Sequence, residues 1–140
     1  MSHHKAFEQP HIEREKRRYQ FKDQGHGNKA TYTLDLSFLG EELRNAGRTG
    51  EDVGTILANA REDIATAFQR SGAVANPEDG GKGRLTHDLL QRYDNLMSRI
   101  NDLIDEAGTS PNEAASTFLD EIMPQIDRLA HAKEADMRVV

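Results

Sequence analysis

The most regular pattern of apolar and polar positions in the chain lies between Thr86 and Ala107. The large apolar residues of this stretch recur at spacings of three and four, so on a helix they form one wide stripe. They are Leu89, Leu90, Tyr93, Leu96, Met97, Ile100, Leu103 and Ile104. Gly108 follows, and we expect it to end the helix in a left-handed conformation. A stripe of this width must be covered by at least two helices, or by one helix and a partner chain, and therefore predicts a helical bundle.

A second helix is predicted directly after the first. Ser110 is its expected N-cap, Pro111 its first residue, and Glu113 the partner of Ser110 in a capping box. Apolar positions continue at helical spacing to Ala130, and the short connection predicts that the two helices are antiparallel. Pro124 cannot donate a backbone hydrogen bond, so we expect a kink about four residues before it.

Two further helices are predicted earlier in the chain. Ser37 is expected to cap a short helix over Phe38–Ala46. Thr49 is expected to cap a longer helix, whose apolar face continues to Phe68 and which ends at Ser71-Gly72. A bundle of three to four helices follows from these patterns.

The pattern changes to alternation between residues 19 and 36. Tyr19 and Phe21 alternate with polar residues, and so do Tyr32, Leu34 and Leu36. The residues between the two runs are rich in glycine and other turn formers. Two alternating runs around such a loop predict a β-hairpin at the N-terminal side of the bundle.

The predicted organisation is a mainly α protein, an antiparallel helical bundle with a small N-terminal β-hairpin or strand. Residues 1–18 are expected to be a mobile basic arm, 19–134 a single domain with its hairpin at 19–36, and 135–140 a frayed tail. Residues 72–84 form the longest linker. Their Gly-Gly-Lys-Gly sequence lacks the first glycine and the final Ser or Thr of a phosphate-binding loop, which favours a flexible linker.

Charge is distributed unevenly along the chain. The net charge is −6, but the first 30 residues carry seven basic and four acidic residues, whereas the remaining 110 carry 11 basic and 20 acidic ones. An acidic body argues against general coating of nucleic acid, although the arm could touch phosphate. No apolar run reaches the roughly 18 residues of a membrane span, so we expect no membrane contact and a cytoplasmic location.

Candidate catalytic and metal-binding residues are scarce. The chain has no cysteine, which excludes disulfides, thiolate nucleophiles and Cys-ligated zinc. His3, His4, His11 and His26 are irregularly spaced, which is typical of surface histidines. Asp127 and His131 are four residues apart, but a bundle metal site uses Glu-x-x-His pairs from facing helices. We therefore expect no enzyme, no metal and no cofactor.

These observations predict a small non-catalytic protein-interaction module of the adaptor, accessory or inhibitor type. Its partner contacts are expected at Leu90, Met97 and Ile104, which are seven residues apart along one edge of the stripe, and at Met123. The acidic body could dock on a protein with a basic surface. A homodimer is the other expected partner, because a second copy could cover the same edge.

An alternative rests on the order of elements from Thr31 onward. A strand, a short helix, a turn and a longer helix resemble a ribbon-helix-helix DNA-binding unit, in which outward strand residues enter the major groove. The resemblance implies a dimeric DNA-binding regulator. Its nucleic-acid contacts would be Arg14, Arg17, Arg18, Thr31 and Thr33.

Overall fold

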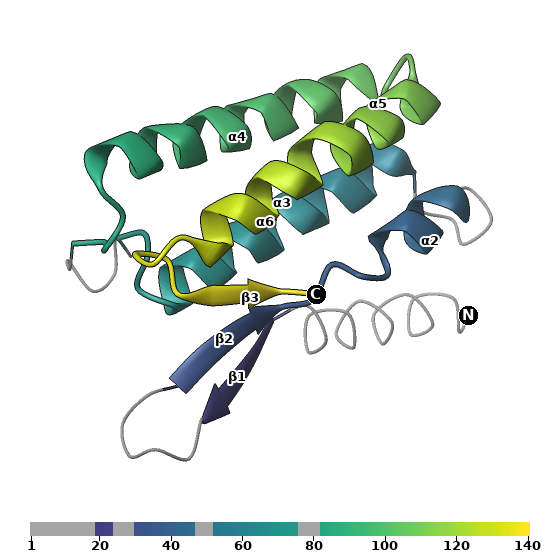
Figure 1. Ribbon diagram of the computed structural model, residues 1–140. Helices are drawn as coiled ribbons and strands as arrows, with labels where there is room; N and C mark the ends of the chain where they lie inside the picture. The colour runs from purple at the N-terminus through teal and green to yellow at the C-terminus, as the bar shows by residue number, and fades with distance from the viewer. Residues whose placement is uncertain (1–18, 24–29, 47–51, 76–81) are drawn as a thin grey trace, which may run out of the picture.

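A computed structural model describes residues 19–23, 30–46, 52–75 and 82–140 of the chain (Figure 1). The elements run in the order β1 (Tyr19–Asp23), β2 (Ala30–Leu34), α2 (Leu39–Arg44), α3 (Val53–Arg70), α4 (His87–Glu106), α5 (Pro111–Thr117), η1 (Phe118–Ile122), α6 (Met123–His131) and β3 (Met137–Val139). α5, η1 and α6 follow one another without a break and form one long helix. The described residues therefore contain four helices: α2, α3, α4 and this long helix. The prediction of a mainly helical protein is confirmed.

The bundle is built by α3, α4 and the long helix from α5 to α6. Figure 1 shows α4 running in the opposite direction to α5–α6, with α3 packed against both. The predicted stripe of α4 faces this core: Tyr93, Leu96, Met97, Ile100 and Leu103 are buried. Its contact with α3 includes the rings of Phe68 and Tyr93, whose centroids are 5.0 Å apart and whose planes are tilted by 46°. The stripe thus forms the centre of the fold, as its width predicts.

The β structure differs in part from the predicted N-terminal hairpin: its two strands pair antiparallel, as predicted, but a third strand joins them. β2 is the middle strand of a mixed sheet: it pairs antiparallel with β1 and parallel with β3. The prediction of a frayed tail over 135–140 is also wrong, because Met137–Val139 form β3. Ala135 and Met137 are buried, and the backbone of Val140 exchanges hydrogen bonds with that of β2 and the residues after it. Burial of these two side chains holds the tail in place.

Two predicted caps are replaced by other residues. Ser37 does not cap α2; its backbone N–H and its hydroxyl both donate to Asp35 Oδ1, at 3.0 and 2.6 Å. The helix begins two residues later. The cap of α3 is Asp52, whose Oδ1 accepts from the backbone N–H of Thr55 at 2.7 Å. This hydrogen bond lowers the pKa of the Asp52 carboxyl below its usual value of 3.8. Thr49, the predicted cap, lies outside the described residues.

The turn between α4 and α5 is partly as predicted. Pro111 is the first residue of α5 and Ser110 its N-cap, but no side-chain hydrogen bond of a capping box forms there. Gly108 does not adopt the predicted left-handed conformation. Among the glycines in the described ranges, positive φ occurs at Gly72, at +83°, directly after the end of α3.

Where a kink is expected, before Pro124, the helix contains a π-helical turn. In η1 the backbone widens, so that the N–H of Met123 donates to the carbonyl oxygen of Phe118, five residues earlier. Pro124 has no N–H with which to continue an α-helical ladder, and the π turn lies directly before it, as a single bulge inside an α-helix. The two parts of the long helix on either side of η1 are otherwise regular.

The described ends of the 72–84 segment, residues 72–75 and 82–84, are held together by hydrogen bonds, whereas its centre, for which a flexible linker is predicted, lies outside the described residues. The backbone N–H groups of Arg84 and Leu85 donate to the carbonyl oxygens of Gly72 and Ala73, at 2.9 and 3.0 Å. The Arg84 guanidinium then donates to the carbonyl oxygens of Glu134 and Ala135, at 3.0 Å each. We call these two side-chain bonds the Arg84 clamp. It joins the α3–α4 connection to the segment that leads into β3.

Candidate functional site

A groove of about 550 Å³ lies between α4 and the helix formed by η1 and α6. We call it the arginine groove. One wall is formed by residues of α4: Leu89, Arg92, Asn95, Leu96 and Arg99. The other wall is formed by residues of η1 and α6: Glu121, Ile122, Gln125, Arg128 and Leu129.

The groove combines an apolar floor with a polar rim. Leu96, Ile122 and Leu129 are buried and form the floor, while the arginine side chains are exposed. On α4 this follows from spacing: steps of three and four residues place alternating Leu and Arg on the same helix face. The rim therefore presents charge directly above an apolar surface, and covering that surface lowers the free energy of the complex.

The basic residues of the helix pair are concentrated in this groove. Between His87 and His131 the chain has three basic residues, Arg92, Arg99 and Arg128, and all three line the groove. The same stretch has nine acidic residues, of which Glu121 alone lines it. A helix pair that is acidic overall thus carries a locally cationic groove, which attracts anionic groups.

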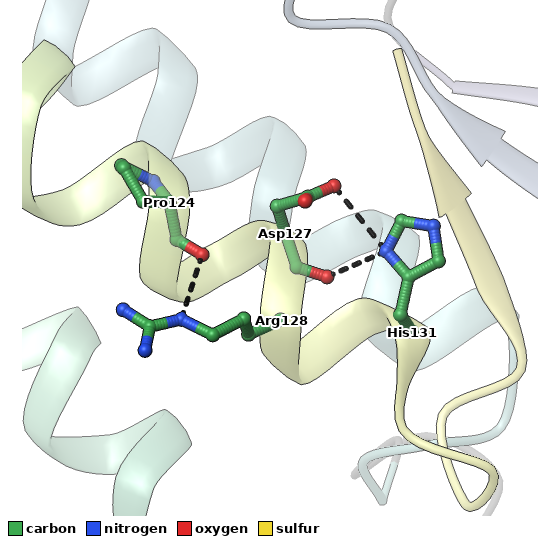
Figure 2. Close-up of polar contacts among 4 residues, drawn as sticks. All are labelled: Pro124, Asp127, Arg128 and His131. Carbon is green, nitrogen blue, oxygen red and sulfur yellow. Dashed lines mark hydrogen bonds and ion pairs between the residues drawn. The ribbon is translucent and has the colours of Figure 1, made fainter.

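The side chains around Arg128 point to different sides of α6. Figure 2 shows Arg128 directed away from Asp127 and His131, with its Nε donating a long hydrogen bond of 3.4 Å to the Pro124 carbonyl oxygen. His131 Nδ1 lies 2.8 Å from the Asp127 carbonyl oxygen and 3.3 Å from its Oδ1. Both of these side chains are more than half exposed, so they form a surface pair outside the groove.

The guanidinium groups of the α4 wall are available for a ligand. Within the described residues, Arg92 and Arg99 take part in no hydrogen bond or ion pair. On the opposite wall, Gln125 Nε2 donates to the Glu121 carbonyl oxygen at 2.9 Å, which orders that side of the rim. Guanidinium groups with free donors bind carboxylates or phosphates through paired hydrogen bonds.

The four residues predicted as partner contacts are not brought together in this groove. Leu90 is 37% exposed, Ile104 and Met123 are half-buried, and Met97 is only 5% exposed. Met97 belongs to the core, and its carbonyl oxygen accepts a hydrogen bond from Arg61 Nε at 3.2 Å. Sequence reasoning followed the apolar stripe and missed the groove, although the confinement of arginine to three helix positions was a signal that it could have used.

The geometry required by the ribbon-helix-helix resemblance is not formed. β2 has a neighbouring strand on each side, so it has no free edge for the strand of a second copy. Thr33 is only 9% exposed and cannot reach a DNA groove from this position. The side chain of Thr31 and the residues Arg14, Arg17 and Arg18 lie outside what the structure describes.

The described ranges hold neither a cluster of metal-ligating side chains nor a membrane-spanning helix. These ranges contain no group of three or more His, Asp or Glu side chains that could hold a metal ion. None of their helices is both long enough and apolar enough to cross a membrane. Comparison with known proteins finds no matching family model, no similar curated protein and no similar solved structure.

Proposed function

We propose that this protein is a non-catalytic interaction module that binds a segment of another protein in the arginine groove. The observation that carries the proposal is the combination of an apolar floor with three arginines drawn from an otherwise acidic helix pair. Covering Leu96, Ile122 and Leu129 supplies affinity, while the rim selects the partner by its charge. This arrangement is that of grooves that accept an amphipathic helix.

The length of the groove fits about two turns of a partner helix. Arg92 and Arg99 are seven residues apart, so the α4 rim extends over about 10 Å along the helix axis. A segment lying along this rim contacts both walls at once and leaves its own ends in solvent. Acidic residues on the remaining surface give the module a second means of contact, with a basic surface of the same partner.

Site-specific photo-crosslinking tests this function. A photoreactive amino acid replaces Asn95 inside the groove or Asp102, an exposed residue of α4 that does not line it. Each protein is illuminated in native cell extract, and adducts are identified by mass spectrometry. We expect a discrete protein adduct from position 95 that is absent at position 102. Equal adducts from both positions, or none from position 95, would contradict the proposal.

A further inference from the structure

We infer that the segment bound in the groove is an acidic amphipathic helix, with carboxylates clustered at the end of the groove where Arg92 and Arg128 meet. This inference rests on the function proposed above and adds the chemistry of the partner. The two ends of the groove differ in charge. α4 and α6 run in opposite directions (Figure 1), so the start of α4 lies beside the end of α6. Arg92 comes from the first part of α4 and Arg128 from the last part of α6, and both line the groove.

The opposite end of the groove has a mixed charge. There α4 contacts η1, which places Arg99 at the level of Glu121. No ion pair between these two residues is present in the described structure, but their charges offset each other for an approaching ligand. The cationic potential is therefore greatest at the Arg92–Arg128 end, and a partner with unevenly placed carboxylates can bind in one direction only.

A carboxylate-bearing helix fits both the floor and the rim. Residues at steps of three and four on the incoming helix cover the buried leucine and isoleucine side chains of the floor. Carboxylates at one end of the same helix can reach Arg92 and Arg128, whereas one placed seven residues away would meet Arg99 beside Glu121 and gain less. A nucleic acid presents bases on a highly charged backbone instead of aliphatic side chains, and the acidic surroundings of the groove repel such a long polyanion.

Selection from a peptide display library tests the inference without knowledge of the partner. Random 16-residue peptides are selected on the immobilised full-length protein at low salt, where exposed charges are least screened. We expect enrichment of sequences that combine Asp or Glu with Leu, Ile or Phe at helical spacing. Failure to select any peptide, or selection of peptides without acidic enrichment, would overturn the inference.

Charge reversal then places the selected peptide in the groove. The double variant Arg92→Glu with Arg128→Glu should weaken binding of the synthetic peptide at least tenfold, and Arg99→Glu should have a smaller effect. A matched double variant, Arg44→Glu with Arg138→Glu, makes the same charge change at exposed residues outside the groove and should bind normally. All five side chains are exposed, so we expect every variant to fold, and circular dichroism checks this.

Two further measurements make each outcome decisive. A peptide in which Lys replaces Glu should regain affinity for the Arg92→Glu and Arg128→Glu protein, because the charges are again complementary. A single-stranded oligonucleotide of equal charge should not compete; competition at equal concentration would show a general polyanion site instead. If the crosslink from position 95 identifies a partner but acidic peptides do not bind, the proposed function stands and this inference fails.

Discussion

The turn between α4 and α5 and the connection between α3 and α4 both reverse the chain between packed helices, but they are held in different ways. The turn is stabilised by backbone hydrogen bonds within six residues: Gly108 donates to Asp105, while Thr109 and Ser110 both donate to Glu106. The connection is stabilised by bonds between its two ends and by the Arg84 clamp, which reaches residues 50 and 51 positions later. The turn can form as soon as its own residues exist, whereas the connection requires the finished fold.

This difference predicts unequal sensitivity to mutation. A local turn tolerates small changes because its neighbours are solvent and its own backbone. In the connection, the backbones of the two ends lie so close together that a side chain at Gly83 has no room. Three experiments test that contrast and a fourth tests the packing of the two helices that the connection joins, in order from the largest expected effect.

Gly83→Ala should destabilise the protein by about 3 kcal/mol, as overpacking does at a site with no room. An added Cβ would lie 2.4 Å from the Ala73 carbonyl oxygen and 2.7 Å from Val74 Cα, which are backbone atoms of the opposite arm. Urea unfolding measures the loss. Gly54→Ala is the matched control, because its Cβ meets neighbours at ordinary contact distances and alanine favours a helix. Equal stability of the two variants would show that the arms can separate freely.

Tyr93 should make the α3–α4 packing sensitive to alkaline pH. Burial raises the pKa of this phenol from 10.0 to about 12, so the folded state retains its proton more strongly than the unfolded state. The contribution to stability is complete below pH 10 and is lost as the pH rises toward 12, by about 2 kcal/mol. Unfolding of the wild type and of Tyr93→Phe is compared across this range. If the free energies of unfolding of the two proteins fall equally as the pH rises, the expectation is wrong.

Arg84→Ala should cost about 1–2 kcal/mol, because two carbonyl oxygens lose a charged donor. Hydrogen exchange should show faster opening of β3 than of α4, since the clamp holds the segment that leads into β3. Arg84→Lys retains the charge without the planar fork and should restore only part of the loss. A uniform increase in exchange over the whole chain would show that the clamp has no local role.

Gly108→Ala should change stability by no more than about 0.5 kcal/mol, as is usual for an exposed position. Its Cβ would lie 3.3 Å from the Asp105 carbonyl oxygen, a close contact that a solvent-exposed turn can relax. The lower backbone freedom of alanine in the unfolded chain offsets the remaining cost. A loss as large as that at Gly83 would remove the distinction between the two connections.

Local signals in the sequence predicted the helices well. The apolar stripe identified α4, and Pro111 and Ser71-Gly72 marked helix boundaries that the structure confirms. Two features were not predictable in the same way. β3 has only three residues and no periodic pattern, and it forms because a distant strand receives it. The Arg84 clamp likewise depends on residues brought near by the whole fold.

The arginine groove was predictable only in part. Arg92 and Arg99 share a face of α4 by simple spacing, which the sequence shows directly. The orientation of Arg128 depends on η1, because the extra residue of a π turn rotates every later side chain by about 100° around the helix axis. A constant α-helical spacing applied to residues 111–131 does not include that rotation and therefore assigns Arg128 to the wrong face. The opposite wall of the groove therefore required the structure.

The parallel pairing of β2 with β3 has a consequence for the order of events during synthesis. Tyr32 of β2 faces Met137, which the ribosome adds about 100 residues later, so one side of β2 must wait for almost the whole chain. The helices can form and pack before that moment. Closure of the sheet is thus expected as the last step of folding, and chains truncated before Met137 should expose the unpaired edge of β2 to chaperones.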